Sequence, residues 1–153
     1  MSVLFIPLLL FAVNSLGQTR TITGKVIDEY LEPLYGITIY NSDSIKQGET
    51  DIEGKFKIEL PADTKNLRLA FVGFNWTTVK LIQGCDHLDI IMMAFATYDF
   101  ISLRKVQKLE VKRFKKFPGI HLSAYQKGIF TTSEACYEQT IDSIEAKTKK
   151  KAR

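Results

Sequence analysis

A tight turn between two extended segments constrains the fold of this chain more than any other feature. The turn occupies residues 50–54, and in residues 55–60 apolar and charged side chains alternate strictly. Such alternation is typical of a β-strand with one buried and one solvent-facing side. Gly54 suits a loop position that requires positive φ, and the Asp51 carboxylate can accept hydrogen bonds from the amides that follow it. The segment therefore predicts a β-hairpin.

Six further segments of similar length surround this hairpin strand, and turn-forming residues separate them. The seven predicted strands lie at residues 19–28, 36–40, 45–50, 55–60, 67–73, 76–82 and 87–93. Short strands at this spacing, with no helical period between them, favour an all-β antiparallel sandwich. We expect Phe56, Phe71 and Phe74 to anchor its two facing sheets.

Charge divides the chain into two parts. With 153 residues, of which 45% are hydrophobic, the chain can bury one sizeable core. Residues 18–99 contain 8 basic and 12 acidic side chains, a net charge of −4, whereas residues 100–153 contain 13 and 5, a net charge of +8. This contrast predicts an acidic domain followed by a basic extension.

The first residues are apolar and uncharged. Residues 3–13 are too few to span a bilayer, which takes about 20 residues in a helix. They match the apolar core of a secretory signal, and Ser15 and Gly17 supply small residues before a cleavage point, although no Lys or Arg precedes the run. The alternative is a buried N-terminal strand. We expect a signal peptide at 1–17, a sandwich at 18–96 and a basic extension at 97–153.

The chain contains two cysteines, Cys85 and Cys136. In an oxidising compartment they can form one disulfide, which would tie the extension to the sandwich. In the alternative interpretation both thiols stay reduced and act as small apolar side chains. The sequence leaves both interpretations open.

Four short blocks carry a recognisable pattern, at residues 24–28, 32–39, 50–56 and 71–74. In this order they resemble the carboxypeptidase regulatory-like domain, a transthyretin-like seven-stranded Greek-key sandwich. They also resemble the small domain that precedes the plug of TonB-dependent transporters in the Bacteroidota. The resemblance covers about residues 19–93, and residues 48–50 depart from the Gly-Thr pair that is usual before the turn. It implies a non-catalytic, secreted or envelope-associated module.

The residues of these blocks are interpreted as structural. Their glycines lie at strand ends or bends, and their aspartates lie where side chains cap turns. The predicted structural set is Gly24, Asp28, Pro33, Gly36, Thr50, Asp51, Gly54, Phe56 and Gly73.

Catalytic patterns are missing from the sequence. A zinc peptidase needs His and Glu ligands at close spacing, but the only histidines, His87 and His121, lie in separate segments. No Gly-x-Ser-x-Gly elbow occurs. Asp51 and Glu53 could in principle hold calcium, but a hairpin tip explains them more simply. We therefore predict no catalytic residues, no metal and no cofactor.

Residues 104–116 form the strongest charge feature, with 7 basic residues and 1 acidic residue. Their pattern fits a helix or a strand. Such a segment can bind an anionic membrane surface, lipopolysaccharide phosphate or the acidic sandwich, or it can be a solvated helix face. Export makes nucleic acid an unnatural partner. The predicted contact residues are Lys112, Arg113, Lys115 and Lys116. Beyond the break at 118–119, short helices are expected within 122–130 and from residue 133.

These observations predict an exported β-sandwich that binds or scaffolds partners in the bacterial cell envelope, at the periplasm or outer-membrane surface. Two alternatives stay open. One is an accessory or remnant of an outer-membrane TonB-dependent transporter. The other is a carbohydrate-binding accessory protein in which Trp76 stacks on sugars, although a tryptophan in a strand is more often part of the core.

Overall fold

The computed structural model describes residues 17–142, so the predicted signal peptide lies outside the described residues except for Gly17. Within this range the chain forms eight strands and two helices. Their bounds are β1 Thr19–Asp28, β2 Thr38–Asn41, β3 Lys46–Glu49, β4 Lys55–Pro61, β5 Asn66–Ala70, β6 Thr77–Lys80, β7 His87–Met92, α1 Leu103–Phe114, α2 Phe117–Gln126 and β8 Glu138–Ile141.

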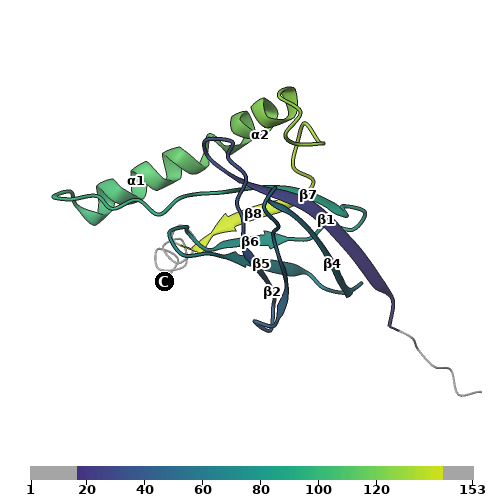
Figure 1. Ribbon diagram of the computed structural model, residues 1–153. Helices are drawn as coiled ribbons and strands as arrows, with labels where there is room; N and C mark the ends of the chain where they lie inside the picture. Colours follow the sequence, from purple (N-terminus) through teal and green to yellow (C-terminus); the bar gives the residue numbers. More distant parts are fainter. Residues whose placement is uncertain (1–16, 143–153) are drawn as a thin grey trace, which may run out of the picture.

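The strands form two sheets, with the helices along one side (Figure 1). A three-stranded sheet has the order β4-β1-β7, and a five-stranded sheet has the order β3-β2-β5-β6-β8. The mostly β architecture is confirmed, but the strand number is eight rather than seven. The prediction of a purely antiparallel sandwich is wrong for one pair, because β1 and β7 run parallel. The chain leaves β6, changes sheets and enters β7 along the free edge of β1.

Strand β8 comes from the predicted basic extension. It pairs antiparallel with β6, with Thr77 opposite Ile141 and Lys80 opposite Glu138. The expectation of a helix beginning near residue 133 is wrong, since this segment leads into a strand. A free sheet edge presents unpaired backbone groups, and β8 satisfies them on β6. The extension therefore completes the second sheet.

The main core lies between the two sheets. In β4 every second side chain is buried, as the alternation predicts. Phe56, Ile58 and Leu60 belong to the main core with residues of both sheets. Phe71 does not act as an anchor, because β5 ends at Ala70 and the Phe71 side chain is 40% exposed in the following turn.

A second core lies between β7 and the helices. It contains Ile91 and Met93 from the β7 region, Phe117 and Ala124 from α2, and Phe130 from the loop after α2. Strand β7 is consequently buried on both faces. The apolar side chains of β7 thus explain why the helices pack on this sheet and not on the other.

The two helices meet at a proline. Pro118 and Gly119 fall in the first turn of α2 rather than in a break before a later helix. Proline is tolerated there because the first amides of a helix have no partner within the helix. Pro118 and Gly119 therefore mark the start of α2. Of the two structures predicted for the basic segment, the helix and not the strand is present, at residues 103–114.

The predicted hairpin is present at the expected turn. Asp51 accepts hydrogen bonds from the amides of Glu53 and Lys55, each at 2.9 Å, and Gly54 adopts φ +74°. The Gly54 carbonyl accepts a hydrogen bond from Val26 N at 2.8 Å, which joins the turn to β1.

Most other residues of the predicted structural set lie in or beside neighbouring turns. The Thr50 hydroxyl is buried, donates to Leu34 O at 2.5 Å and accepts from Ile37 N at 2.9 Å. Asp28 caps its turn by accepting from the amides at 30 and 32, at 2.8 and 3.0 Å. Pro33 forms an isolated bridge with Ile27, and Gly36 and Gly73 have positive φ. The prediction that Gly24 lies at a strand end or bend is wrong, because it lies in the middle of β1, where the close approach of Leu88 O leaves no room for a Cβ.

Candidate functional site

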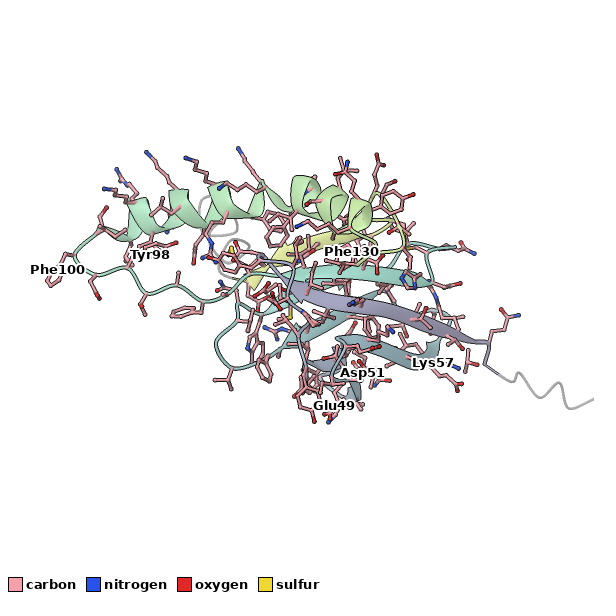
Figure 2. The ribbon with its side chains drawn as sticks, turned by 45° about the horizontal axis from the view of Figure 1, so that its top comes forward. Glu49, Asp51, Lys57, Tyr98, Phe100 and Phe130 are labelled. Carbon is pink, nitrogen blue, oxygen red and sulfur yellow. A yellow bond between two sulfur atoms is a disulfide. The ribbon has the colours of Figure 1, made fainter. Side chains whose placement is uncertain are left out.

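The outer face of α1 carries a continuous row of positive charge. Six exposed cations form this row, which we call the basic ridge: Arg104, Lys105, Lys108, Lys112, Lys115 and Lys116. In α1, spacings of three, four and seven residues place the first four on one side of the helix, and Lys115 and Lys116 continue the row in the turn before α2. Figure 2 shows nitrogen-tipped side chains along the side of α1 that points away from the sheets. None of the six has an ion-pair partner among residues 17–142.

Arg113 does not belong to this ridge, which corrects the predicted contact set. Its side chain turns toward the sandwich, where it forms an ion pair with Glu29 and donates to Ala94 O at 2.9 Å. Each helical residue is rotated by about 100° from the preceding one, so Arg113 lies off the face of α1 that Lys105, Lys108 and Lys112 share. Sequence reasoning had left Arg104, Lys105 and Lys108 out of the set, although the helical period could have found them.

Exposed apolar side chains lie beside the start of the ridge. Phe100 is fully exposed at the tip of the loop before α1, where Figure 2 labels it, and Leu103 is 80% exposed. Phe95 in the same loop is also exposed. A basic helix face next to exposed Phe and Leu side chains is typical of helices that lie in a membrane interface. Among the described residues, neither helix has the length and apolar character needed to cross a bilayer.

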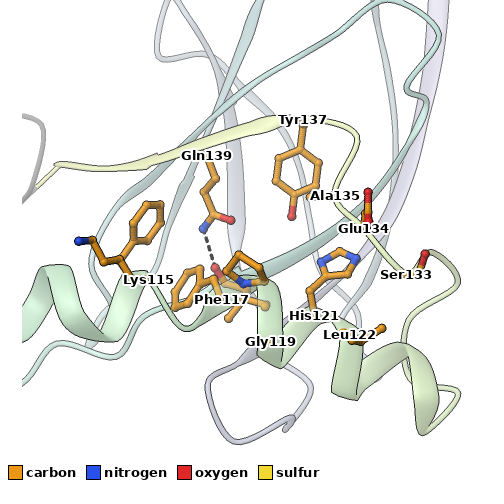
Figure 3. A pocket seen from close by; sticks show the side chains of 13 residues that line it. Lys115, Phe117, Gly119, His121, Leu122, Ser133, Glu134, Ala135, Tyr137 and Gln139 are labelled. Carbon is orange, nitrogen blue, oxygen red and sulfur yellow. Dashed lines mark hydrogen bonds between the residues drawn. The ribbon is translucent and has the colours of Figure 1, made fainter.

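A cleft of about 950 Å³ lies beside the ridge (Figure 3). We call it the α2 cleft, because α2 forms one wall and the segment leading into β8 forms another. Its lining is mainly apolar, and its two charged residues, Lys115 and Glu134, lie at opposite ends in Figure 3. The main lining residues are Ile91, Phe114, Phe117, Leu122, Ala135 and Tyr137.

The polar groups inside the α2 cleft are held by the protein. His121 is only 4% exposed, and burial lowers the pKa of its imidazole, with Nε2 3.0 Å from Thr132 O. The Tyr137 hydroxyl donates to the Asp89 carbonyl, and burial raises the pKa of this phenol. Gln139 Nε2 donates to Ile91 O at 2.7 Å. At neutral pH the cleft interior is therefore uncharged.

A buried carboxylate holds this region together. Asp89 is 1% exposed, and its Oδ1 lies 3.0 Å from His87 Nε2. Its Oδ2 accepts from the amides of Thr131 and Thr132 at 2.8 and 3.2 Å, and from their hydroxyls at 3.1 and 3.3 Å. Sequence reasoning missed Asp89, although a charged residue within an apolar strand was the available signal. The carboxylate thus fixes the loop after α2 to β7.

Thr23 extends this network, because its hydroxyl lies 3.1 Å from His87 Nδ1. The order hydroxyl, imidazole and carboxylate also occurs in nucleophilic triads. Here, however, four of the five hydrogen bonds to the carboxylate come from the Thr131–Thr132 loop. We therefore interpret Asp89 as an anchor.

We expect Asp89→Asn to lower the free energy of unfolding by about 2–3 kcal/mol. The side-chain NH2 group of the variant would face the amides and hydroxyls that donate to the carboxylate, and it cannot accept their hydrogen bonds. Urea unfolding followed by far-UV circular dichroism measures this loss. Asp63→Asn is the matched control, since Asp63 is exposed and should change stability by less than about 0.5 kcal/mol. Equal stability of both variants would contradict the anchor role.

The structure also shows where the two cysteines and Trp76 lie. Cys85 and Cys136 form a disulfide with a Cα–Cα distance of 5.8 Å, which joins the turn before β7 to the segment before β8. Trp76 is 47% exposed rather than a core residue, and the Arg68 guanidinium lies 4.4 Å from its ring centroid. Within residues 17–142, no group of three or more His, Cys, Asp or Glu side chains is arranged to hold a metal ion.

Comparison with known proteins identifies one family. The family model described as CarboxypepD_reg-like domain matches residues 22–98, about half of the chain. The match spans β1 to β7 and ends before α1, so the basic ridge and most of the α2 cleft lie outside it. No curated protein matches the chain.

Proposed function

The chain belongs to the CarboxypepD_reg-like domain family, and on this premise we propose that it is a non-catalytic, exported binding module of the bacterial cell envelope. In this proposal the sandwich is a scaffold, and the basic ridge binds an anionic membrane surface. Domains of this family are regulatory and non-catalytic. The apolar N-terminal sequence supports export.

The observation that carries the proposal is the basic ridge. Six cations of α1 and the turn after it face solvent without an ion-pair partner among the described residues, and a shallow groove of about 500 Å³ runs along four of them. Each Lys or Arg near an anionic membrane contributes about 1 kcal/mol to binding. The exposed Phe100 and Leu103 side chains add an apolar contact at one end. The combination of cations and exposed apolar side chains favours the interpretation that this face binds a membrane surface over the interpretation that it contacts only solvent.

Replacing Lys108, Lys112 and Lys115 with Gln tests the proposal. We expect affinity for phosphatidylglycerol vesicles, measured by sedimentation at low salt, to fall about 100-fold, because three charges are removed. Glutamine preserves helix propensity, so α1 should remain folded.

The matched control removes three cations from the sandwich, at Lys25, Lys57 and Lys65, and so gives the same net charge. This control variant should bind within about threefold of the unmodified chain, because its mutations lie away from the ridge. The proposal is wrong if both triple variants lose binding equally, or if the ridge variant binds as well as the unmodified chain.

The exposure of Trp76 favours a second candidate function, carbohydrate binding. A half-exposed indole can stack on a sugar ring, and the Arg68 guanidinium, which is paired with Asp142, lies over the ring of Trp76. Glycan-array binding that is lost in Trp76→Ala would support this function. If no glycan is bound, the candidate is excluded and the membrane proposal is unaffected. An accessory role beside a TonB-dependent transporter is compatible with either function.

A further inference from the structure

We propose that the α2 cleft binds one acyl chain of an anionic membrane lipid, whose head group lies at Lys115. This inference rests on the proposed function, because it assigns the head group to the basic ridge. It goes further by assigning a second, apolar site to the same lipid. Three observations support it: the lining of the cleft, its charge distribution and its rigid support.

The size and lining of the α2 cleft suit an apolar chain. Its volume of about 950 Å³ lies at the upper end of ordinary ligand pockets, which measure roughly 300–1,000 Å³. Phe114, Phe117 and Leu122 supply apolar surface from the helices, and Ile91 supplies it from β7. The polar side chains within, His121 and Tyr137, are uncharged at neutral pH for the reasons given above. An acyl chain would therefore meet no charge along the walls.

The charges at the two ends set the direction of the ligand. Lys115 lines the α2 cleft, the groove along the ridge and a third hollow beside Glu29, so its side chain stands where the three meet. Glu134 lies at the opposite end of the cleft (Figure 3). An anionic head group is attracted to Lys115 and repelled by Glu134. The chain would then extend from the ridge into the cleft.

The walls of the cleft are held in place without a ligand. The Asp89 carboxylate fixes the loop after α2, and the disulfide at Cys136 fixes the segment that carries Ala135. Gln139 is fixed to β7 by its hydrogen bond to Ile91 O. A preformed pocket avoids the entropic cost of ordering its walls during binding.

Gly119 offers a way to fill the cleft without disturbing the fold. It lines the cleft, and a Cβ built on it meets no atom within 4 Å. Gly119→Phe should therefore place a ring at this part of the lining, and Ala62→Phe, at an exposed position that does not line the cleft, serves as the control. Ala135→Phe fills the cleft from the opposite wall, at an exposed position, and provides a second blocking variant.

The test is isothermal titration of the full-length chain with sodium dodecanoate below its micelle concentration. We expect the unmodified chain and Ala62→Phe to bind equally, and the two variants with Phe in the cleft, Gly119→Phe and Ala135→Phe, to bind at least tenfold more weakly. Decanoate should bind about tenfold more weakly than dodecanoate, because two methylenes are left unburied. Dodecyltrimethylammonium, with the same chain and opposite charge, should also bind at least tenfold more weakly.

The other outcomes overturn the cleft assignment, the proposed function or both. The cleft assignment is overturned if dodecanoate does not bind, or if Gly119→Phe and Ala135→Phe both bind it as well as Ala62→Phe does. If vesicles still bind through the ridge in that case, the proposed function stands alone. If dodecanoate binds in the cleft but vesicles do not bind the chain, the membrane lipid is overturned as the occupant, together with the proposed function.

Discussion

Gly24→Ala is expected to lower the free energy of unfolding by about 4 kcal/mol or to prevent folding. A Cβ at this position would lie 2.0 Å from the Leu88 carbonyl oxygen and 2.8 Å from its carbon. Overpacking usually costs about 1–3 kcal/mol, but here the obstacle is backbone of the neighbouring strand, which cannot rotate away. The parallel β1–β7 pair would have to separate. Soluble yield and the urea midpoint measure the effect.

Two further glycine variants make this prediction decisive. Gly54→Ala should cost about 3 kcal/mol, because its Cβ would lie 2.4 Å from Val26 O and its φ is +74°. Gly119→Ala should instead be neutral or stabilise by up to about 1 kcal/mol, since its Cβ meets open space within a helix. If Gly24→Ala were as stable as Gly119→Ala, the close approach of β1 and β7 would be wrong.

The second large effect is expected from the disulfide. Cys85 and Cys136 are 51 positions apart, and cross-linking a loop of this length stabilises by about 4 kcal/mol in the chain-entropy model. Removal of the disulfide by Cys136→Ser should therefore lower the melting temperature by about 10 °C.

Reductant provides the control for this prediction. A phosphine reductant should lower the melting temperature of the unmodified chain to that of Cys136→Ser and leave the variant unchanged. Alkylation under denaturing conditions without reductant should label neither cysteine of the unmodified chain. Two labelled thiols, or melting that does not respond to reductant, would contradict the pairing.

The strands that depend on local pattern were predictable. β1 has the predicted bounds, Thr19–Asp28, because its β-branched residues alternate between the two faces. The hairpin at Asp51 and Gly54 follows from turn chemistry, which acts over a few residues. The family blocks lie in the same part of the chain, and the family match confirms the resemblance over residues 22–98.

Features that depend on distant contacts were not predictable. β8 forms because the edge of β6 is free to pair with it. The paired residues Lys80 and Glu138 are 58 positions apart, so no local sequence pattern reveals that this edge is available. The parallel β1–β7 pair likewise depends on a contact between segments that lie far apart in the sequence. Phe71 alternates like a strand residue, yet it lies outside the sheet because β5 ends one residue earlier. Strand ends are set by pairing and only weakly by composition.

The candidate site was predicted only in part. The sequence identified residues 104–116 as basic. The four predicted contact residues, however, were not chosen by the spacing of residues on one helix face, so Arg113 was included and Arg104 was not. The α2 cleft could not be predicted, because its walls come from α1, α2, β7 and the segment before β8. Its walls depend on the pairing of β8 with β6 and on the hydrogen bonds of the Asp89 carboxylate to the loop after α2.

The family match and the candidate site occupy different parts of the chain. Residues 22–98 supply most of the two sheets, which β8 completes, whereas the basic ridge lies at residues 104–116. The loop hydrogen-bonded to Asp89 and the disulfide connect the second part to the first. Under the proposed function, the sandwich would hold the ridge and the cleft in place for the membrane lipid.

Hydrogen–deuterium exchange with and without phosphatidylglycerol vesicles tests the membrane-binding role of the ridge most directly. The proposal predicts that vesicles slow amide exchange in residues 98–116, covering the tip at Phe100 and the helix that carries the ridge, and leave β3 and β4 unchanged. Protection on the sandwich strands, with none in residues 98–116, would contradict it.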